Sequence, residues 1–325
     1  MRILVTGSAG HLGEALVRTL RGSGHDVIGL DLLDSPHTDA VASVTDRRVV
    51  REVIAGADAV LHTATLHKPH VLSHARQDFV DTNVTGTLVL LEEAVDAGVS
   101  AFVYTSTTSG FGRALTPGEG EPAAWITEDV VPRPRNIYGV TKVVAEDLCE
   151  LVARDHGLPC LVLRTSRFFP EPDDSEFVRS GYADDNAKVN ELLYRRIDLS
   201  DAVAAHVAAL ERAPLLGFGR YVISATTPFS RAEDGQLPVD APAVVERLVP
   251  DYPGTYQRLG WRMFPRIDRV YDNARARDDL HWEPRYDFRH ALGRLRNGRE
   301  PRSALATSVG AKGYHSKTTG PYTTR

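Results

Sequence analysis

The chain contains little cysteine, no long apolar run and no excess of positive charge. Only Cys149 and Cys160 occur among its 325 residues. Two cysteines cannot form the disulfide framework of a small secreted protein, so we expect a reducing, cytoplasmic location. No apolar stretch approaches the roughly 20 residues of a membrane span, and the N-terminus lacks a signal-peptide pattern. We therefore predict no membrane partner.

The charge balance also disfavours nucleic acid as a partner. The formal net charge is −5 at pH 7, whereas a nucleic-acid-binding protein usually has a strongly basic face. With 42% hydrophobic and 25% charged residues, the composition is that of an ordinary globular protein. The length allows one large or two modest domains with an ample core.

Apolar strands alternate with helical segments over the first 170 residues. Strands are predicted at 1–7, 25–31, 57–64, 101–107 and 158–166, and helices at 14–24, 47–56, 78–98 and 136–157. This alternation predicts an α/β fold with a Rossmann-type, doubly wound parallel sheet, whose ligands bind at the carboxyl ends of the strands.

The pattern predicts two domains and a tail. Residues 1–169 form the Rossmann domain, to which some later segments return. Residues 170–301, irregular and rich in Pro, Asp and Arg, are expected to form a smaller mixed lobe that binds substrate. Residues 302–325 are polar and lack periodicity, so we expect a tail that is disordered or lies along the lobe.

The stretch TGSAGHLG joins the first strand to the first helix. Gly7, Gly10 and Gly13 allow a sharp turn, close approach of a pyrophosphate, and tight packing of helix against strand. The second strand ends in Asp31, whose carboxylate can bind the adenosine ribose hydroxyls. No Arg or Lys follows in DLLDSP to accept a 2′-phosphate, so NAD is favoured over NADP.

Tyr138 and Lys142 lie four residues apart on a predicted helix and therefore on one face. A tyrosine pKa near 10 is too high for a good base at neutral pH. A neighbouring ammonium and a positive nicotinamide ring would lower it. Upstream, the strand-end segment YTSTTSGFG supplies hydroxyls that could hold a substrate oxygen; they belong to Ser106, Thr107, Thr108 and Ser109.

The stretch LHTATLHKPHVLSH carries His62, His67, His70 and His74. Histidine is the commonest protein metal ligand, so a zinc or iron site is one interpretation. The other is a loop whose histidines have separate roles. Nothing in the stretch supplies a regular ligand geometry, and we predict no metal.

Together these motifs resemble the extended branch of the short-chain dehydrogenase/reductase superfamily, the NAD-dependent sugar epimerases and dehydratases. The matching stretches are TGSAGHLG, Asp31, VLHTAT, Asn83 in TNVTGT, YTSTTSGFG, YGVTK, RRIDLSDAVAAHVAAL and DNARARDDLHWEPRYDF. The resemblance implies that Tyr138 is the general base and acid and that Lys142 binds the nicotinamide ribose. Thr107 stands where the family usually has a catalytic serine, with Ser106 as a less favoured substitute.

The resemblance also implies which residues contact NAD and substrate. Cofactor contacts are expected from Gly7, Ala9, Gly10, His11, Leu12, Gly13, Asp31, Ser43, Val44, His62, Ala64, Thr65, Asn83, Thr105, Tyr138, Lys142 and Arg167. For His62, packing at the strand end is the favoured alternative. Substrate contacts are expected from His67, Thr108, Ser109, Arg167 and Arg262. Since NAD takes the electrons, this chemistry needs no metal.

The substrate is less sharply indicated. RFFPEPDD resembles uronate dehydrogenases, which oxidise a free sugar acid, but Glu191 stands where those enzymes have an arginine. The closing stretch and Arg262 favour the epimerase branch. We predict a nucleotide-sugar epimerase, with a dehydrogenase of a free sugar or sugar acid as the alternative. An NAD-sensing protein without activity is disfavoured because Tyr138 and Lys142 are both present. A homodimer is common in the resembled family and is expected here.

Overall fold

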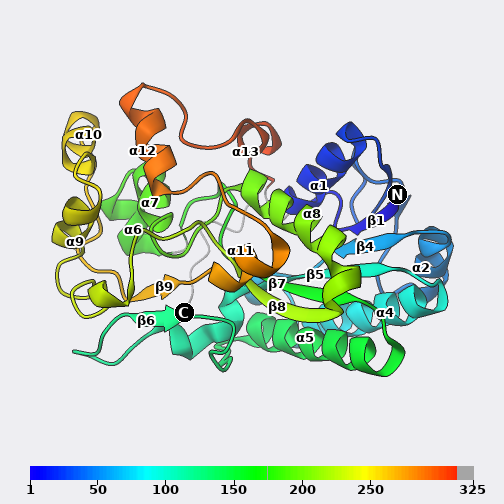
Figure 1. Ribbon diagram of the computed structural model, residues 1–325. Helices are drawn as coiled ribbons and strands as arrows, with labels where there is room; N and C mark the ends of the chain where they lie inside the picture. The colour runs from blue at the N-terminus through cyan, green and yellow to red at the C-terminus, as the bar shows by residue number, and fades with distance from the viewer. Residues whose placement is uncertain (174, 313–325) are drawn as a thin grey trace.

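A computed structural model of the protein, which describes residues 1–173 and 175–312, contains the predicted parallel sheet (Figure 1). Its strand order is β3-β2-β1-β4-β5-β7-β8, and every neighbouring pair is parallel. The strands are β1 (Arg2–Thr6), β2 (Asp26–Asp31), β3 (Ala40–Val41), β4 (Ala59–His62), β5 (Ala101–Thr107), β7 (Cys160–Thr165) and β8 (Phe218–Ile223). The order reverses at β1, as in a doubly wound fold.

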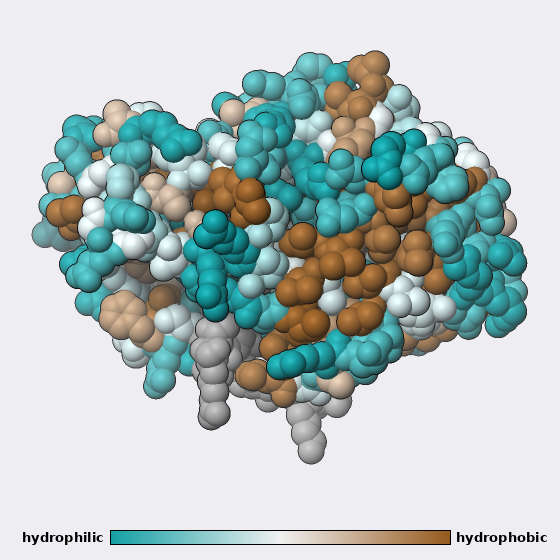
Figure 2. Space-filling view, turned by 90° about the horizontal axis from the view of Figure 1, so that it is seen from below, coloured by the Kyte–Doolittle hydropathy of each residue, from teal (hydrophilic) through white to brown (hydrophobic). Residues whose placement is uncertain are grey.

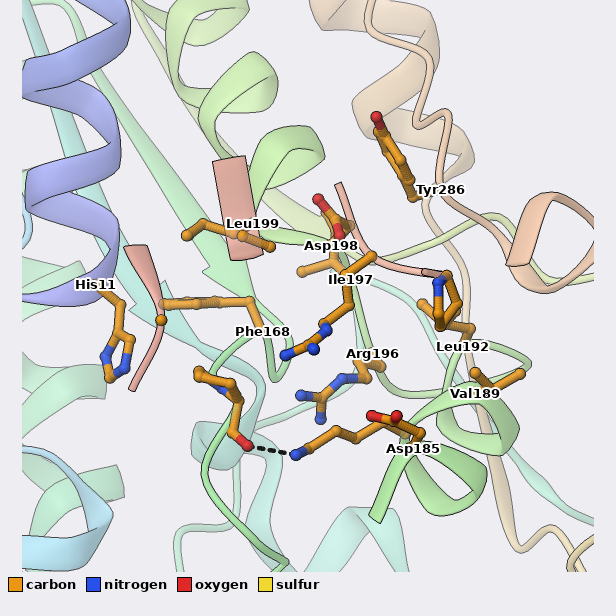
Figure 3. Close-up of a pocket in the computed structure, with 16 residues that line it drawn as sticks. His11, Phe168, Asp185, Val189, Leu192, Arg196, Ile197, Asp198, Leu199 and Tyr286 are labelled. Atoms are coloured by element: carbon orange, nitrogen blue, oxygen red, sulfur yellow. Dashed lines mark hydrogen bonds between the residues drawn. The ribbon is translucent and has the colours of Figure 1, made fainter. Parts of the chain in front are cut away.

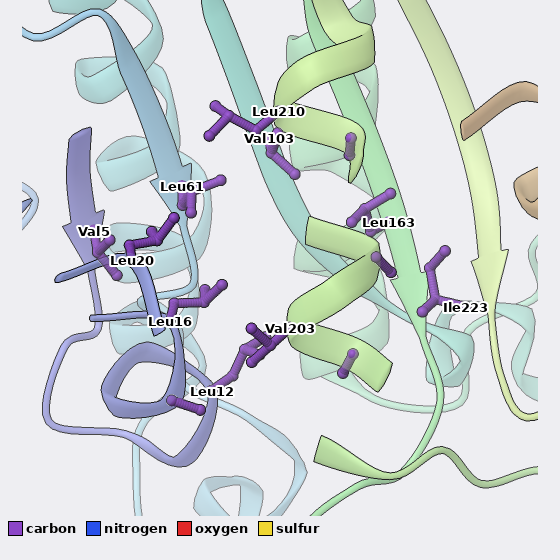
Figure 4. Packing of buried hydrophobic residues seen from close by; sticks show 14 of the residues in the cluster. Val5, Leu12, Leu16, Leu20, Leu61, Val103, Leu163, Val203, Leu210 and Ile223 are labelled. Atoms are coloured by element: carbon purple, nitrogen blue, oxygen red, sulfur yellow. The ribbon is translucent and has the colours of Figure 1, made fainter. Parts of the chain in front are cut away.

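Helices cover both faces of this sheet because its strands are apolar on both sides. One face packs against α1 (His11–Gly22) and α8 (Leu199–Leu216). The other packs against α2 (Arg47–Ile54), α4 (Gly86–Asp96) and α5 (Ile137–His156). Figure 4 shows the first layer, in which side chains of α1 and α8 meet strand residues such as Val103 and Leu163.

Segments from the second half of the chain return to the sheet. Strand β8 forms its edge, and α11 (Ala274–Leu280) packs against α8 and β8. Helix α13 (Ala304–Val309) packs against α1 and α8 and buries Ala306 and Val309. Of the two alternatives for the tail, disorder does not hold for Ala304–Val309, because Ser303 caps a short helix that packs on α1 and α8. The remainder of the predicted tail, 313–325, lies outside the described residues.

The second lobe has a core of its own, which includes Leu237, Val245 and Phe288. Its helices are α6 (Glu176–Gly181), α7 (Asp184–Glu191), α9 (Ala241–Leu248), α10 (Tyr252–Leu259) and α12 (Phe288–Arg296). A small parallel sheet pairs β6 (Ala124–Ile126) with β9 (Arg269–Tyr271). Because β6 precedes residue 170, the lobe also takes in part of the segment that the sequence assigned to the first domain.

Five short helical segments connect these elements. They are η1 (Lys68–Leu72), α3 (Arg76–Phe79), the π-helical η2 (Val80–Thr85), η3 (Thr108–Leu115) and η4 (Arg231–Glu233). Three of them, η1, η2 and η3, lie beside the carboxyl ends of β4 and β5, where ligands of such sheets bind. Within the described ranges, no helix is both long and apolar enough to cross a membrane.

Candidate active site

The glycine turn after β1 is close-packed and accepts no larger side chains. Gly7 has φ of +74°, and a β-carbon there would lie 2.7 Å from the Ala64 amide nitrogen. A β-carbon on Gly13 would lie 1.9 Å from the Gly7 carbonyl oxygen. Helix α1 begins directly after Gly10, which provides no side-chain cap. The turn therefore offers backbone N–H groups and a positive helix end, which fit a dinucleotide pyrophosphate.

Asp31 lies over this turn at the end of β2. Its two carboxylate oxygens accept hydrogen bonds from the Ala9 and Leu33 amides, each at 2.9 Å. The carboxylate is thus held in place by backbone groups. This arrangement fits the predicted recognition of ribose hydroxyls and would repel a 2′-phosphate. The Ala9 amide, which the sequence assigned to the cofactor, is committed to Asp31.

Tyr138 and Lys142 lie on one face of α5, as predicted. Asn136 caps this helix by accepting a hydrogen bond from the Gly139 amide at 3.0 Å. Tyr138 is 8% exposed and Lys142 is 2% exposed. The Lys142 Nζ donates a hydrogen bond to the Thr105 carbonyl oxygen at 2.7 Å and lies 4.1 Å from the centre of the Tyr104 ring. The lysine is therefore anchored on β5.

The pKa of Tyr138 is raised in the protein alone, and the predicted lowering, which invokes the nicotinamide ring together with Lys142, stays a prediction. Burial raises the pKa of Tyr138 to about 12, and a hydrogen bond with Thr107 opposes this only in part. Burial also lowers the pKa of Lys142 to about 7. In the protein alone desolvation dominates the pKa of Tyr138, and the Lys142 ammonium is directed at the Thr105 carbonyl.

The strand-end hydroxyls have different partners. Thr107 is the last residue of β5, and its Oγ1 accepts a hydrogen bond from the Ser109 amide at 3.1 Å. Thr107 therefore presents its hydroxyl beside Tyr138. Ser106 points toward α5 and donates to Glu146 Oε1 at 2.5 Å. Thr108 is buried and Ser109 half-buried. The geometry thus favours Thr107 over Ser106 as the substrate-orienting hydroxyl.

Three predicted cofactor residues are occupied by contacts within the protein. The Thr105 hydroxyl is 2.8 Å from His206 Nε2, on the α8 side of the sheet. Asn83 bonds the Leu66 backbone and the Thr65 and Thr141 hydroxyls. Both ring nitrogens of His62 bond threonine hydroxyls, at 2.7 and 3.0 Å, and its side chain is almost wholly buried. These three side chains therefore hold together the elements that form the site.

The histidine loop follows β4 and approaches the glycine turn. Ala64 lies beside Gly7, and the Thr65 hydroxyl donates to Asn83 at 2.9 Å. His67 precedes η1, where its amide donates to His70 Nδ1 at 2.9 Å. Within the described ranges, no three His, Cys, Asp or Glu side chains are grouped so that they could hold a metal ion. The metal-free interpretation of this stretch remains a prediction.

Phe169 links this loop to the glycine turn. Its ring centre is 6.5 Å from that of His67 and 6.3 Å from that of His11. The His11 Nε2 also lies 2.9 Å from Glu171 Oε1. Sequence reasoning assigned no role to Phe169, although it lies two residues after Arg167 in the segment that follows β7. The feature of the sequence that could have indicated a role for Phe169 is the pair of phenylalanines in RFFP.

Ser43 and Val44, predicted to contact the cofactor, lie between β3 and α2. The Ser43 hydroxyl is 2.8 Å from that of Thr45. Val44 is buried, and a β-carbon on Gly86 would lie 2.5 Å from its Cγ2. The Val44 side chain therefore packs against α4, so only the backbone of this segment could face a cofactor.

Arg167 belongs to a cluster of charged side chains after β7. Its Nη1 is 2.6 Å from Asp173 Oδ2 and 3.5 Å from Glu191 Oε1. Arg195 and Arg196 contact Glu191 at 2.6 and 2.8 Å. Burial would raise the pKa of Glu191, but these arginines hold it well below its usual range. In the sequence, Glu191 stands where uronate dehydrogenases have an arginine. The sequence alone does not reveal that three arginines surround this carboxylate.

Arg262, the other predicted phosphate or carboxylate contact, is exposed on the second lobe. Its guanidinium lies 4.8 Å from the Tyr182 ring centre and donates to the Gly181 carbonyl. Its contacts are with Gly181, Tyr182, Asn186 and Asn190, and thus with residues of the second lobe. Its substrate role remains a prediction that these contacts do not support.

A pocket lies between the start of α1, the segment after β7, and helices α7 and α8 (Figure 3). Phe168, Leu192 and Leu199 give it an apolar wall, and Lys188 at its rim donates to the Pro170 carbonyl. His11 connects it to the glycine turn. Because Tyr138 and Lys142 do not line it, this pocket is not the place where their chemistry would occur.

Residues 3–223 match the model of the NAD dependent epimerase/dehydratase family. The chain belongs to this family. The resemblance to NAD-dependent sugar epimerases and dehydratases is thereby confirmed, and NAD is the cofactor. The glycine turn and Asp31 fit that cofactor independently of the match.

Several curated proteins are similar to parts of the chain or to most of it. The low-salt glycan biosynthesis protein Agl12 of Haloferax volcanii is 34% identical over 52% of this chain and 57% of its own length. A UDP-glucose 4-epimerase of Erwinia amylovora is 30% identical over 46% and 47%. A 3 beta-hydroxysteroid dehydrogenase/Delta 5→4-isomerase of Mycobacterium tuberculosis is 28% identical over 90% and 88%. The chain spans about half the length of the relatives it matches first, at 57%, 39% and 50%.

Solved structures agree with the fold. A short-chain dehydrogenase/reductase superfamily protein from Agrobacterium tumefaciens with bound NAD superposes with a TM-score of 0.65 at 22% identity, over 95% of this chain and 97% of that one. A UDP-glucose 4-epimerase of Thermotoga maritima with UDP-glucose gives 0.61 at 22% identity, over 92% and 99%. At this identity the similarity establishes the fold alone.

Proposed function

We propose that this protein is an NAD-dependent enzyme that oxidises a secondary hydroxyl of a nucleotide sugar and then reduces it again, as an epimerase. The observation that carries the proposal is the arrangement at the end of β5. There Thr107 ends the strand close enough to Tyr138 to oppose part of the rise in the tyrosine pKa, and Lys142 is anchored one helical turn away. These groups can hold a substrate hydroxyl and move its proton.

NAD, when bound on the glycine turn, supplies the hydride acceptor. Thr107 then holds the substrate oxygen, and Tyr138 Oη accepts its proton. Because burial raises the pKa of Tyr138, the phenolate needs positive charge nearby, which Lys142 provides when protonated. On the return step Tyr138 Oη gives the proton back. The buried site excludes the water that would compete for it.

The UDP-glucose 4-epimerase relatives support a nucleotide sugar as the substrate. The cluster of three arginines against two carboxylates after β7 leaves an excess of positive charge, which suits an anionic substrate. An epimerase keeps its cofactor and returns the hydride to the opposite face of the ketone.

A net dehydrogenase is the second candidate. The Mycobacterium tuberculosis relative named as a 3 beta-hydroxysteroid dehydrogenase aligns with 90% of this chain, whereas the epimerase of Erwinia amylovora aligns with 46%. The groups around Tyr138 would serve either reaction, since both begin with the oxidation of a secondary alcohol. The two candidates differ in whether NADH leaves.

Two measurements separate these candidates. Purified protein is denatured and its released NAD(H) is quantified, and a panel of nucleotide sugars, free sugars, sugar acids and 3β-hydroxysteroids is tested. An epimerase retains stoichiometric cofactor and inverts a carbon in the product, as seen by NMR. A dehydrogenase is isolated empty and accumulates NADH. If no member of the panel is converted, the proposed function fails.

We also propose that the protein forms a homodimer through α5. Val140, Val144 and Leu151 are each at least 40% exposed on this helix, and Figure 2 shows apolar side chains gathered on the face that carries it. A pair of such helices would bury this stripe. Light scattering should give twice the mass of 35.6 kDa, and Val144→Glu together with Leu151→Glu should give the monomer.

A further inference from the structure

Glu146 continues the stripe that Tyr138 and Lys142 begin on α5. The three residues follow one another at intervals of four, so they lie on one face of the helix. Glu146 is 1% exposed and is therefore as deeply buried as Lys142. The stretch YGVTKVVAED already contained this spacing, but nothing in the sequence indicated what the carboxylate contacts.

The Glu146 carboxylate joins α5 to two strands. Ser106 on β5 donates to its Oε1 at 2.5 Å, and Arg164 on β7 donates to its Oε2 from Nε at 3.0 Å and from Nη2 at 2.8 Å. Ser106 and Arg164 are partners in the β5–β7 register. Arg220 on β8 lies 3.4 Å from Oε2. The Glu146 side chain thus fixes α5 to one pair of facing residues on β5 and β7, next to Thr107.

Glu146 is also the charged group that most opposes the lowering of the Lys142 pKa. The titratable groups around the lysine are Tyr138, Glu146 and Cys149 on α5, Tyr104 on β5 and His62 on β4, with Arg164 beyond on β7. Burial raises the pKa of the tyrosines and of Cys149 and lowers that of His62. These four groups are therefore uncharged at neutral pH. Burial lowers the pKa of Lys142 to about 7, and Glu146 is the foremost group opposing that shift.

We propose that Glu146 is a positioning residue for the reaction: it fixes α5 against β5 and β7 and keeps the Lys142 ammonium charged beside Tyr138. The link to turnover rests on the proposed function, whereas the effect on Lys142 does not. Ser106 and Arg164 complete the assembly, since they hold the carboxylate in place.

The test is the affinity of Glu146→Gln for NAD, measured by calorimetry from pH 6 to pH 9. Lys142 is expected to bind the nicotinamide ribose as an ammonium, so affinity falls as the lysine loses its proton. Without the nearby carboxylate this fall should occur about one pH unit lower than in the wild type. If a member of the substrate panel is converted, the basic limb of the pH–rate profile of Glu146→Gln should also move to lower pH.

Removal of Glu146 leaves Arg164 as an unpaired buried charge, which could unfold the protein. The double variant Glu146→Gln/Arg164→Met removes both charges and should show the same shift. Asp147→Asn is the matched control, because it deletes an exposed carboxylate from the next position of α5 that also contacts Arg220. It should keep the wild-type pH dependence.

The outcomes separate this proposal from the proposed function. If Glu146→Gln and the double variant bind NAD with the pH dependence of the wild type, Glu146 only packs the helix and the proposal is overturned. If the shift is present but the wild type converts no member of the panel, the role of Glu146 at Lys142 stands and the epimerase proposal fails.

Discussion

Lys142 Nζ donates a hydrogen bond to the Thr105 carbonyl oxygen at 2.7 Å, two residues before Thr107. The ammonium is therefore held on the strand that also carries Thr107, the residue proposed to orient the substrate oxygen. On the other face of the sheet the Thr105 hydroxyl bonds His206. A single strand residue thus connects α5 and α8 across the sheet at the site.

Thr107→Ala should lower turnover by roughly 10–100-fold, because it removes one hydrogen bond that orients the substrate oxygen. Thr107→Ser keeps the hydroxyl and should be nearly neutral. Steady-state kinetics on the best substrate of the panel would compare the two variants. Equal losses in both would indicate that the methyl group of Thr107, rather than its hydroxyl, matters at the end of β5.

Asp31 should make the protein prefer NAD over NADP by at least about 10-fold, or about 1.4 kcal/mol. Its carboxylate is held over the glycine turn by the Ala9 and Leu33 amides, where it would repel a 2′-phosphate. Calorimetry with both cofactors measures the ratio. Asp31→Ala should reduce it, while Asp34→Ala, which removes an exposed carboxylate from the same loop, should not.

His206 should make the protein sensitive to acid. Burial lowers the pKa of His206 from 6.5 to about 4. Between these two pH values His206 is protonated in the unfolded chain but neutral in the folded protein. Stability is complete above pH 6.5 and is lost as the pH falls toward 4, by up to about 3 kcal/mol at 1.36 kcal/mol per unit.

The free energy of unfolding in urea, measured between pH 7 and pH 4.5, tests this. Stability of the wild type should fall more steeply than that of His206→Gln, which does not titrate. His156→Gln is the control, because His156 is exposed and should leave the slope unchanged. Parallel curves for the wild type and His206→Gln would contradict the role assigned to His206.

The histidine loop should bind no transition metal. In a separate test of the same loop, His67→Ala should weaken substrate binding or turnover, since His67 lies beside Phe169 at the start of η1. The test for a metal is independent of that variant. Elemental analysis of protein purified without a metal-affinity tag should give no stoichiometric metal, and chelators should leave activity intact. Near-unit occupancy by any metal would overturn this interpretation.

Much of the fold could be predicted because its signals are local. Runs such as ILV in β1 and the glycines of TGSAGHLG specify a strand, a turn and a helix within a few residues. The spacing of Tyr138 and Lys142 likewise fixes a common helix face without knowledge of the tertiary structure.

The contacts of His62, Asn83 and Thr105 within the protein depend on partners that are distant in sequence. Each of them forms a hydrogen bond with a side chain of another element. The partners are Thr87 for His62, Thr141 for Asn83 and His206 for Thr105. The direction of the Tyr138 shift could not be inferred either, because desolvation depends on burial by the whole fold. Only the structure brings these groups together.

Tyr138→Phe should abolish most activity while leaving the fold and NAD affinity intact. The change removes one hydroxyl from a buried ring on α5, so packing is conserved, but the group that takes the substrate proton is gone. General acid–base catalysis typically contributes 10²–10⁴-fold, and kcat should fall by about that factor. Tyr252→Phe deletes a hydroxyl from the second lobe, where it bonds the Pro242 carbonyl, and should be close to wild type.

NADH formation and product stereochemistry would be followed for both variants on the best substrate of the panel, with calorimetry to show that each still binds NAD. Loss of turnover in Tyr138→Phe alone, with unchanged cofactor affinity, places the proton transfer at Tyr138 Oη. If instead Tyr138→Phe converts the substrate as fast as the wild type, the burial that raises the pKa of Tyr138 serves only the stability of α5. The base would then have to be another group near Thr107.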